Sequence, residues 1–187
     1  MNEDIKKAIE VLRQGGTILY PTDTIWGIGC DPTNEEAVNK LYDIKQRDKN
    51  KPMLLLLDNP GRLQAYIQDV PDIAWDLIEL TDKPLTLIFN GAKNLASNLI
   101  NKDGSIGIRI TSENFSRNLC ARFRKPIVST SANMAGEEAP RNFSEIDPAI
   151  IEQVDYVVKY RQEETYNQTP SAIIKLGRSG QVEIIRK

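Results

Sequence analysis

Hydrophobic positions along the chain follow two spacings in turn, and this alternation predicts helices and strands that succeed one another. Helical spacing begins at Ile5 and ends at the glycines of 15–16. The same spacing recurs later and predicts helices at 33–44, 60–67, 71–80, 112–123 and 144–152. Short continuous apolar runs predict strands at 17–20, 53–57, 84–89, 105–110, 126–129, 155–158, 171–176 and 181–186.

The order of these elements predicts an α/β fold with one twisted sheet of mixed parallel and antiparallel strands and helices on both sides. Helices and strands alternate over the first two-thirds of the chain, whereas the last two strands flank a turn at 177–180 that fits a hairpin. Two helix starts carry cap signals, a capping box from Thr33 to Glu36 and a hydroxyl at Ser112. The chain has 187 residues and no repeat or linker, so we expect a single domain over 1–187.

The chain contains no histidine, and this absence narrows the chemistry more than any other count. It excludes Ser-His-Asp and Cys-His catalysis, histidine-ligated metal sites and imidazole acid–base chemistry. Catalysis would rely on carboxylates, lysine, arginine, hydroxyls, the backbone or a diffusible metal. The net charge of −2 argues against a global basic field that recruits nucleic acid, although a local basic patch stays open.

Three features predict a cytoplasmic protein. The first residues are acidic and lead into an amphipathic helix, unlike a secretory signal peptide. The apolar runs are too short to span a bilayer, so no membrane partner is expected. Cys30 and Cys120 match no metal-binding spacing and no CxxC motif, and we interpret both as reduced structural thiols.

The stretch 20–29 is the first candidate site. Pro21 cannot donate into a strand ladder, so the strand before it must end or turn there. Thr22, Asp23 and Thr24 follow, and two glycines then frame an exit from the turn. Small polar side chains at the carboxyl end of a strand stand where α/β proteins bind ligands, although the same residues also suit an ordinary turn.

Four cations at alternate positions form the second candidate, which we name the cationic row: Lys45, Arg47, Lys49 and Lys51. On an extended backbone, alternate side chains point to the same side. We therefore expect a solvent-facing row of positive charge that suits a polyphosphate. The plainer alternative is a solvated charged loop.

A hydroxyl-rich loop and one buried arginine complete the candidates. Ser129 ends a predicted strand, and Ser131 and Asn133 follow it. There they can bind phosphate oxygens, a ribose or an amino acid, or else cap their own turn. Arg109 lies in a strand that otherwise reads as buried. Because arginine is rarely buried unpaired, it must meet a carboxylate, either of the protein or of a ligand.

Three motifs in this order resemble those of the Sua5/YrdC/YciO family. Residues 20–29, YPTDTIWGIG, are similar to the family's YPT(E/D)T-(Y/W)-G-(L/I)-G opening. Lys45 and Arg47 match its K-x-R motif, and Ser131 and Asn133 match its S-x-N motif. The similarity covers essentially the whole chain. It implies the YrdC-like fold, a twisted mixed sheet around a concave, positively charged cavity.

The resemblance implies L-threonylcarbamoyladenylate synthase activity, a nucleotidyl transfer that uses L-threonine, bicarbonate and ATP. The products are pyrophosphate and threonylcarbamoyl-AMP, which supplies the N6-threonylcarbamoyladenosine modification of tRNA. ATP would act with Mg²⁺, with no prosthetic group and no metal site made by the protein alone. Further implied partners are tRNA or double-stranded RNA and other proteins of the same modification pathway.

The family pattern also implies a role for each matching residue. The residues expected to carry catalysis are Lys45, Arg47, Ser131 and Asn133. The residues expected to bind ATP are Lys45, Arg47, Lys51, Ser131, Asn133 and Arg186. The residues expected to bind threonine are Thr24, Arg109, Ser129 and Ser171. Arg109 would bind the threonine carboxylate, and Thr22 would support the site from behind.

Departures from the family pattern leave the subfamily open. Ala172 stands where relatives often have threonine, so we expect one hydroxyl of the site to be missing. Lys51 replaces an asparagine, histidine or similar residue, and the loop 134–138 is acidic where relatives often carry S-G-x-P. One alternative is a YciO-like protein that binds structured RNA without adenylating threonine. Another is an ATP-dependent carbamoyl or acyl transferase for a different amino acid.

Overall fold

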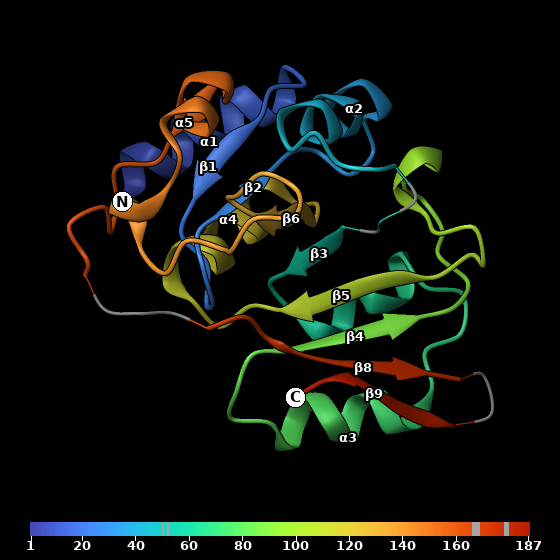
Figure 1. Ribbon diagram of the computed structural model, residues 1–187. Coiled ribbons are helices and arrows are strands. Elements are labelled where there is room, and N and C mark those ends of the chain that lie inside the picture. The colour runs from blue at the N-terminus through green and yellow to red at the C-terminus, as the bar shows by residue number, and fades with distance from the viewer. Residues whose placement is uncertain (50, 52, 166–168, 178–179) are drawn as a thin grey trace.

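The computed structural model describes residues 1–49, 51, 53–165, 169–177 and 180–187. Within them nine strands form one sheet in the spatial order β7-β1-β2-β6-β3-β5-β4-β8-β9 (Figure 1). The strands are β1 (Ile18–Tyr20), β2 (Gly27–Gly29), β3 (Leu54–Leu57), β4 (Leu85–Phe89), β5 (Ile106–Ile110), β6 (Ile127–Ser131), β7 (Tyr156–Val157), β8 (Ala172–Leu176) and β9 (Val182–Arg186).

Parallel and antiparallel pairs share this sheet, which confirms the predicted mixed topology. The pairs β1–β7, β3–β5 and β4–β8 run parallel, and the other neighbours run antiparallel. The predicted hairpin near the end of the chain is present as β8 and β9. Residues 178–179 of its turn lie outside the described residues.

The helices also follow the predicted order, with local differences. They are α1 (Asn2–Arg13), α2 (Glu35–Ile44), α3 (Asp72–Leu80), α4 (Asn114–Phe123) and α5 (Pro148–Gln153). Short 3-10 segments stand at Pro60–Ala65, Ser97–Leu99 and Phe143–Glu145. A 3-10 segment therefore replaces the helix predicted at 60–67, and the helix predicted at 144–152 is divided in two.

The side chains that cap two helices differ from the predicted ones. Asn34, not Thr33, accepts a hydrogen bond from a backbone N–H in the first turn of α2. Glu113, not Ser112, accepts hydrogen bonds from two backbone N–H groups in the first turn of α4. A carboxylate suits this position because the amino end of a helix carries partial positive charge.

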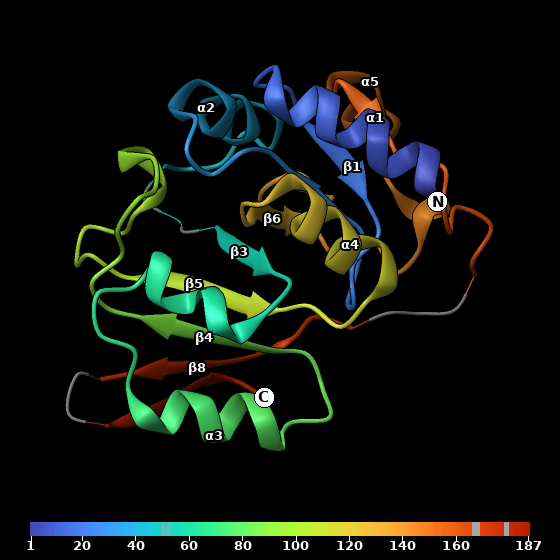
Figure 2. The same ribbon diagram turned by 180° about the vertical axis from the view of Figure 1, so that it is seen from behind.

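Helices cover both faces of the sheet, because alternate residues of each strand point to opposite sides. Leu55 and Leu57 of β3 belong to a core cluster that also holds apolar side chains of α2 and α3. Leu56 belongs to a second cluster with α1 and α4, which lie side by side in Figure 2. Cys30 and Cys120 are buried and unbridged, one in each cluster, as expected for structural thiols.

Part of the sheet stays open on one side. In the view of Figure 1, no helix of the described residues stands in front of β5, β4 and β8. Gly107 and Arg109 alternate with Ile108 along β5, and Thr86 precedes Leu87 on β4. Ile108 and Leu87 face the core cluster, so the other three share the opposite face, where they line a cavity.

The sequence does not predict β2, because glycine is disfavoured in strands and 27–29 reads as the exit of a turn. In the structure this segment pairs with both β1 and β6 in the middle of the sheet. Lack of a side chain allows the close approach. A Cβ added at Gly29 would stand 2.8 Å from Cε1 of Tyr20 and closer still to the carbonyl oxygen of Val128.

Gly29→Ala is therefore expected to lower the free energy of unfolding by about 2–3 kcal/mol, because the neighbouring strands must move to admit the methyl group. Urea unfolding followed by circular dichroism measures the change. Gly61→Ala is the control, since its Cβ would meet only the flexible side chain of Asn59 at 3.2 Å. Equal stability of the Gly29 variant and the parent chain would contradict the packing role of β2.

Candidate functional site

A cavity of about 380 Å³ opens on the uncovered side of the sheet. Small-molecule sites typically measure roughly 300–1,000 Å³. Most of the predicted site residues line it: Thr22, Thr24, Arg47, Arg109, Ser129, Ser131, Asn133, Ser171 and Arg186. Lys45 and Lys51 are not among the lining residues.

The turn after β1 brings two threonines to the cavity. β1 ends directly before Pro21, as predicted. The Thr22 hydroxyl donates to the carbonyl of Ile25 at 2.8 Å and lies 3.1 Å from the Thr24 hydroxyl. Both threonines are almost fully buried in the wall. Thr22 thus closes the turn and fixes the place of Thr24.

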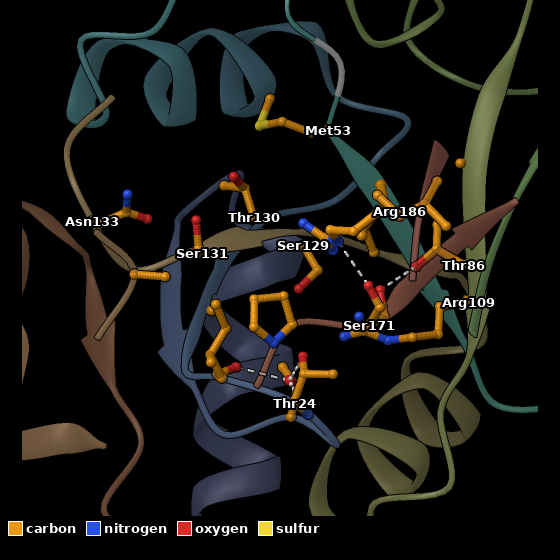
Figure 3. Close-up of a pocket in the computed structure, with 18 of the residues that line it drawn as sticks. Thr24, Met53, Thr86, Arg109, Ser129, Thr130, Ser131, Asn133, Ser171 and Arg186 are labelled. Atoms are coloured by element: carbon orange, nitrogen blue, oxygen red, sulfur yellow. Dashed lines mark hydrogen bonds between the residues drawn. The ribbon is translucent and has the colours of Figure 1, made fainter. Parts of the chain in front are cut away.

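The cavity has two ends in Figure 3. Ser131 and Asn133 lie at one end, Arg109 and Ser171 lie at the other, and Ser129 lies between them. β6 continues beyond its predicted end to Ser131 because it pairs there with β2. Ser131 and Asn133, which the family pattern assigns to ATP, are therefore separated within the cavity from Arg109 and Ser171, which it assigns to threonine.

Asn133 shapes the loop that follows β6. Its side-chain amide nitrogen donates to the carbonyls of Met134 at 3.0 Å and Glu137 at 2.8 Å. Both protons of this amide are therefore engaged within the loop. Asn133 lines the cavity, but its amide donors are already hydrogen-bonded to backbone carbonyls of its own loop.

Lys45 does not face solvent, contrary to the prediction. It directly follows α2, and its side chain is 0 % exposed. The ammonium donates to the carbonyls of Ser131 and Asn133, the latter at 2.7 Å, and it lies 3.4 Å from the side-chain oxygen of Asn133. Burial and the nearby Arg47 lower the pKa of Lys45 to about 7. Lys45 therefore ties the loop after β6 to the end of α2.

The prediction that the four side chains of the cationic row point to one side is wrong. Gln46 adopts a left-handed φ of 48°, which breaks the extended backbone on which alternate side chains would align. Lys49 lies on the surface and donates to the side-chain oxygen of Asn39 at 2.9 Å. Lys51 is exposed and does not line the cavity. Arg47 alone of the row lines the cavity, and its Nε donates to the Lys51 carbonyl at 3.2 Å.

Arg109 meets a carboxylate of the protein and also reaches the cavity. Its Nε lies 3.0 Å from Oδ1 of Asp23, and both side chains are nearly fully buried. In Figure 3 its guanidinium points toward Ser171. Burial raises the pKa of Asp23 and lowers that of Arg109, while the opposite charge of each partner works against both shifts. The sequence predicts that Arg109 meets a carboxylate but does not identify it, and Asp23 is not among the predicted site residues.

Ser171 lies at the junction of two strands that come late in the chain. Its hydroxyl is 2.8 Å from the hydroxyl of Thr86 on β4. Its carbonyl accepts a hydrogen bond from Nε of Arg186 on β9 at 2.9 Å. Arg186 is therefore held beside Ser171, at the end of the cavity that the family pattern assigns to threonine (Figure 3).

Some wall residues escaped the sequence prediction. Thr86 is a single polar residue in the otherwise apolar run 85–89, and this interruption was the available signal. Trp26 and Met53 contribute apolar wall, and nothing in their local sequence separates them from core residues. Ala172 is not among the lining residues, although Ser171 and Ile173 on either side of it are. The cavity wall therefore does not include the position where we expected a hydroxyl to be missing.

The charged side chains of the wall are Arg47, Arg109, Arg186 and Glu137. The excess of guanidinium groups suits an anionic ligand.

Over the described ranges, no group of three or more Asp, Glu, His or Cys side chains is placed to hold a metal ion. Over the same ranges, the structure contains no helix that is long and apolar enough to cross a membrane.

Comparisons with known proteins give a consistent family. The Sua5/YciO/YrdC model, described as "Telomere recombination", matches residues 10–187. A threonylcarbamoyl-AMP synthase from Pseudoalteromonas translucida is 36% identical over 95% of this chain and 95% of its own. A threonylcarbamoyl-AMP synthase from Xanthomonas euvesicatoria is 33% identical over 96% of each chain.

Solved structures agree with this assignment. E. coli YciO matches with a TM-score of 0.86 and 26% identity, over 100% of this chain and 90% of its own. P. abyssi Sua5 complexed with L-threonine matches with a TM-score of 0.82 and 20% identity, over 92% of this chain and 50% of its own. This chain spans about half the length of that Sua5, and at such identity the likeness shows the fold alone. By its matched length and its relatives, the chain belongs to the Sua5/YciO/YrdC family.

Proposed function

We propose that the chain is an L-threonylcarbamoyladenylate synthase, which converts L-threonine, bicarbonate and ATP into threonylcarbamoyl-AMP and pyrophosphate. One observation carries the proposal: residues of three motifs that lie far apart in the sequence line a single cavity with three arginines in its wall. Relatives named threonylcarbamoyl-AMP synthase over nearly the full chain support it. The product would supply the N6-threonylcarbamoyladenosine modification of tRNA.

The ATP phosphates are assigned to Arg47 and to the end of the cavity that holds Ser131. The planar guanidinium matches phosphate oxygens, and the serine hydroxyl can donate to them. Lys45 and Asn133 act here by holding the loop after β6, because their donors already serve its carbonyls. Lys51 receives no contact in this assignment, since it is exposed outside the cavity.

Threonine is assigned to the other end. Arg109 would bind its carboxylate, and the hydroxyls of Thr24, Ser129 and Ser171 would contact its amine and hydroxyl. Arg186 extends from β9 over Ser171 and would contact the nucleotide where the two substrates meet. All five residues are in the cavity wall.

The reaction suits a wall of arginines and hydroxyls without histidine. The threonine amine and bicarbonate form a carbamate with loss of water. A carbamate oxygen then attacks the α-phosphorus of ATP, and pyrophosphate leaves. Bicarbonate, the carbamate and ATP are anions, so correct placement and charge neutralisation account for most of the expected rate gain.

Further partners follow from the same activity. Mg²⁺ would enter with ATP, coordinated by its phosphates, and we assign it no protein ligand. We propose no prosthetic group, a cytoplasmic location, and transfer of the product to tRNA by other proteins of the modification pathway.

The proposal predicts that the purified protein releases pyrophosphate from ATP and bicarbonate only when L-threonine is present. Mass spectrometry of the mixture should detect threonylcarbamoyl-AMP. Serine and other small amino acids in place of threonine test whether the substrate is a different amino acid. If the P. translucida relative releases pyrophosphate under the same conditions and this chain does not, the proposal is wrong.

The YciO-like alternative predicts a different result, and the similarity to E. coli YciO is the observation that keeps it in view. A protein that only binds structured RNA would show no threonine-dependent pyrophosphate. Its affinity for double-stranded RNA should fall steeply as salt rises, because phosphate contacts release counterions.

A further inference from the structure

The ion pair between Asp23 and Arg109 is unusual for its burial. Its side chains are 6 % and 4 % exposed, and their charged atoms are 3.0 Å apart. A buried pair loses most of the solvation of both charges, so it is weak evidence for a stabilising role. Its position at the wall of a ligand cavity points instead to a role in binding.

The two partners differ in their access to the cavity. Arg109 lines the cavity, whereas Asp23 is not among the lining residues and lies behind it. Nε of Arg109 and Oδ1 of Asp23 are both buried, and neither forms a hydrogen bond with a described residue, although the two atoms lie 3.0 Å apart as an ion pair. Within the part of the chain that the structure describes, no side chain or backbone oxygen accepts a hydrogen bond from the two terminal nitrogens of Arg109. These nitrogens point along the side chain toward Ser171 (Figure 3).

The guanidinium of Arg109 has two edges at which a carboxylate can bind. A carboxylate can bind side-on, through Nε and one terminal nitrogen, or end-on, through both terminal nitrogens. Asp23 places its carboxylate on the Nε side of the guanidinium, with Oδ1 3.0 Å from Nε. The end-on edge remains for a carboxylate that enters from the cavity.

The turn after β1 explains how Asp23 comes to this place. The hydrogen bond from the Thr22 hydroxyl to the carbonyl of Ile25 closes the turn at 2.8 Å. Thr22 and Thr24 thereby face the cavity, and Asp23 between them points behind Arg109. One tight turn thus supplies the threonine hydroxyls of the wall and the carboxylate that orients its arginine.

We infer that Asp23 is a positioning residue, which holds Arg109 so that its end-on edge receives the α-carboxylate of the amino-acid substrate. The inference rests on the proposed function, in which Arg109 binds threonine. Asp23 itself does not contact the substrate. It acts by fixing the plane of the guanidinium and by balancing its charge in a buried site.

Asp23→Asn tests this role because it removes the charge and keeps the shape. Calorimetric titration in the presence of a non-hydrolysable ATP analogue should show about a 10-fold loss of affinity for L-threonine, the scale of one charge-assisted hydrogen bond. L-threoninol lacks the carboxylate, so its affinity should be unchanged by the substitution. A general structural defect would weaken both compounds alike.

Two further variants keep the result interpretable. Asp31→Asn is the matched control, because Asp31 is also a buried carboxylate in an ion pair, with the exposed Lys125 at 2.7 Å, and does not line the cavity. It should leave threonine affinity unchanged. If Asp23→Asn does not fold, Asp23→Glu keeps the charge but displaces it by one methylene. It should again weaken threonine and spare threoninol.

Each outcome separates this inference from the proposed function. Parent-like threonine affinity in the Asp23 variants, or equal losses for threonine and threoninol, would overturn the positioning role. Either result leaves threonine-dependent pyrophosphate release by the parent chain intact. A parent chain that binds no threonine and releases no pyrophosphate would overturn the proposed function, and this inference with it.

Discussion

Arg47→Ala is expected to bind ATP about 100-fold more weakly than the parent chain while unfolding at the same temperature. Charge-assisted hydrogen bonds to phosphate are worth roughly 1.5–3 kcal/mol, and 100-fold corresponds to about 2.7 kcal/mol. Stability should hold because Arg47 is half-buried at the cavity wall and lies outside the two core clusters. Calorimetric titration with ATP and thermal unfolding measure the two quantities.

Arg13→Ala provides the matched control for Arg47. It makes the same change of charge at an exposed position at the end of α1. If both variants lost ATP affinity equally, the effect would reflect overall charge and not a phosphate contact. If Arg47→Ala bound ATP like the parent chain, Arg47 would have no part in the ATP site.

Lys45→Met is expected to lower the rate of pyrophosphate release through the loop after β6, whereas Arg47→Ala loses a phosphate contact. Methionine has a similar length and cannot donate, so the carbonyls of Ser131 and Asn133 lose the ammonium that holds them. Buried acceptors without a partner cost about 1–3 kcal/mol, and relief from burying a charge offsets part of this. We therefore expect about 1–2 kcal/mol less stability and about a 100-fold lower rate of pyrophosphate release.

A double-mutant cycle distinguishes loop anchoring from phosphate binding. If Lys45 and Asn133 act on the same loop, the losses in Lys45→Met and Asn133→Ala should be strongly non-additive in the double variant. Lys49→Met is the control, because Lys49 lies on the surface and contacts Asn39. Unchanged stability together with additive losses would instead favour a direct contact between Lys45 and ATP.

Much of the fold could be predicted because most elements carry a local pattern. α1 shows helical spacing and a glycine pair after it, and β3 is a continuous apolar run. β2 shows no such pattern. Glycine is required at position 29 because a side chain there would collide with Tyr20 and Val128 on the neighbouring strands. This packing between distant segments is not visible in the local sequence.

The candidate site could be predicted as a set of residues but not as an arrangement. Regular spacing suggested that Lys45 and Arg47 share one side, whereas the end of α2 and the left-handed Gln46 separate them. The carboxylate partner of Arg109 was required by its burial. The identity of that partner, Asp23, depends on a contact between segments far apart in the chain.

The arrangement of the cavity has a consequence for the synthesis of the protein. The turn that carries Thr24 leaves the ribosome before Ser171 and Arg186, which complete the same cavity wall. β1 also pairs with β7, and β4 with β8, so much of the sheet forms between distant segments. Such pairing slows folding. A nascent chain can thus form α1 and α2 before the strands that pair over long distances, but it completes the cavity only after residue 186 has emerged.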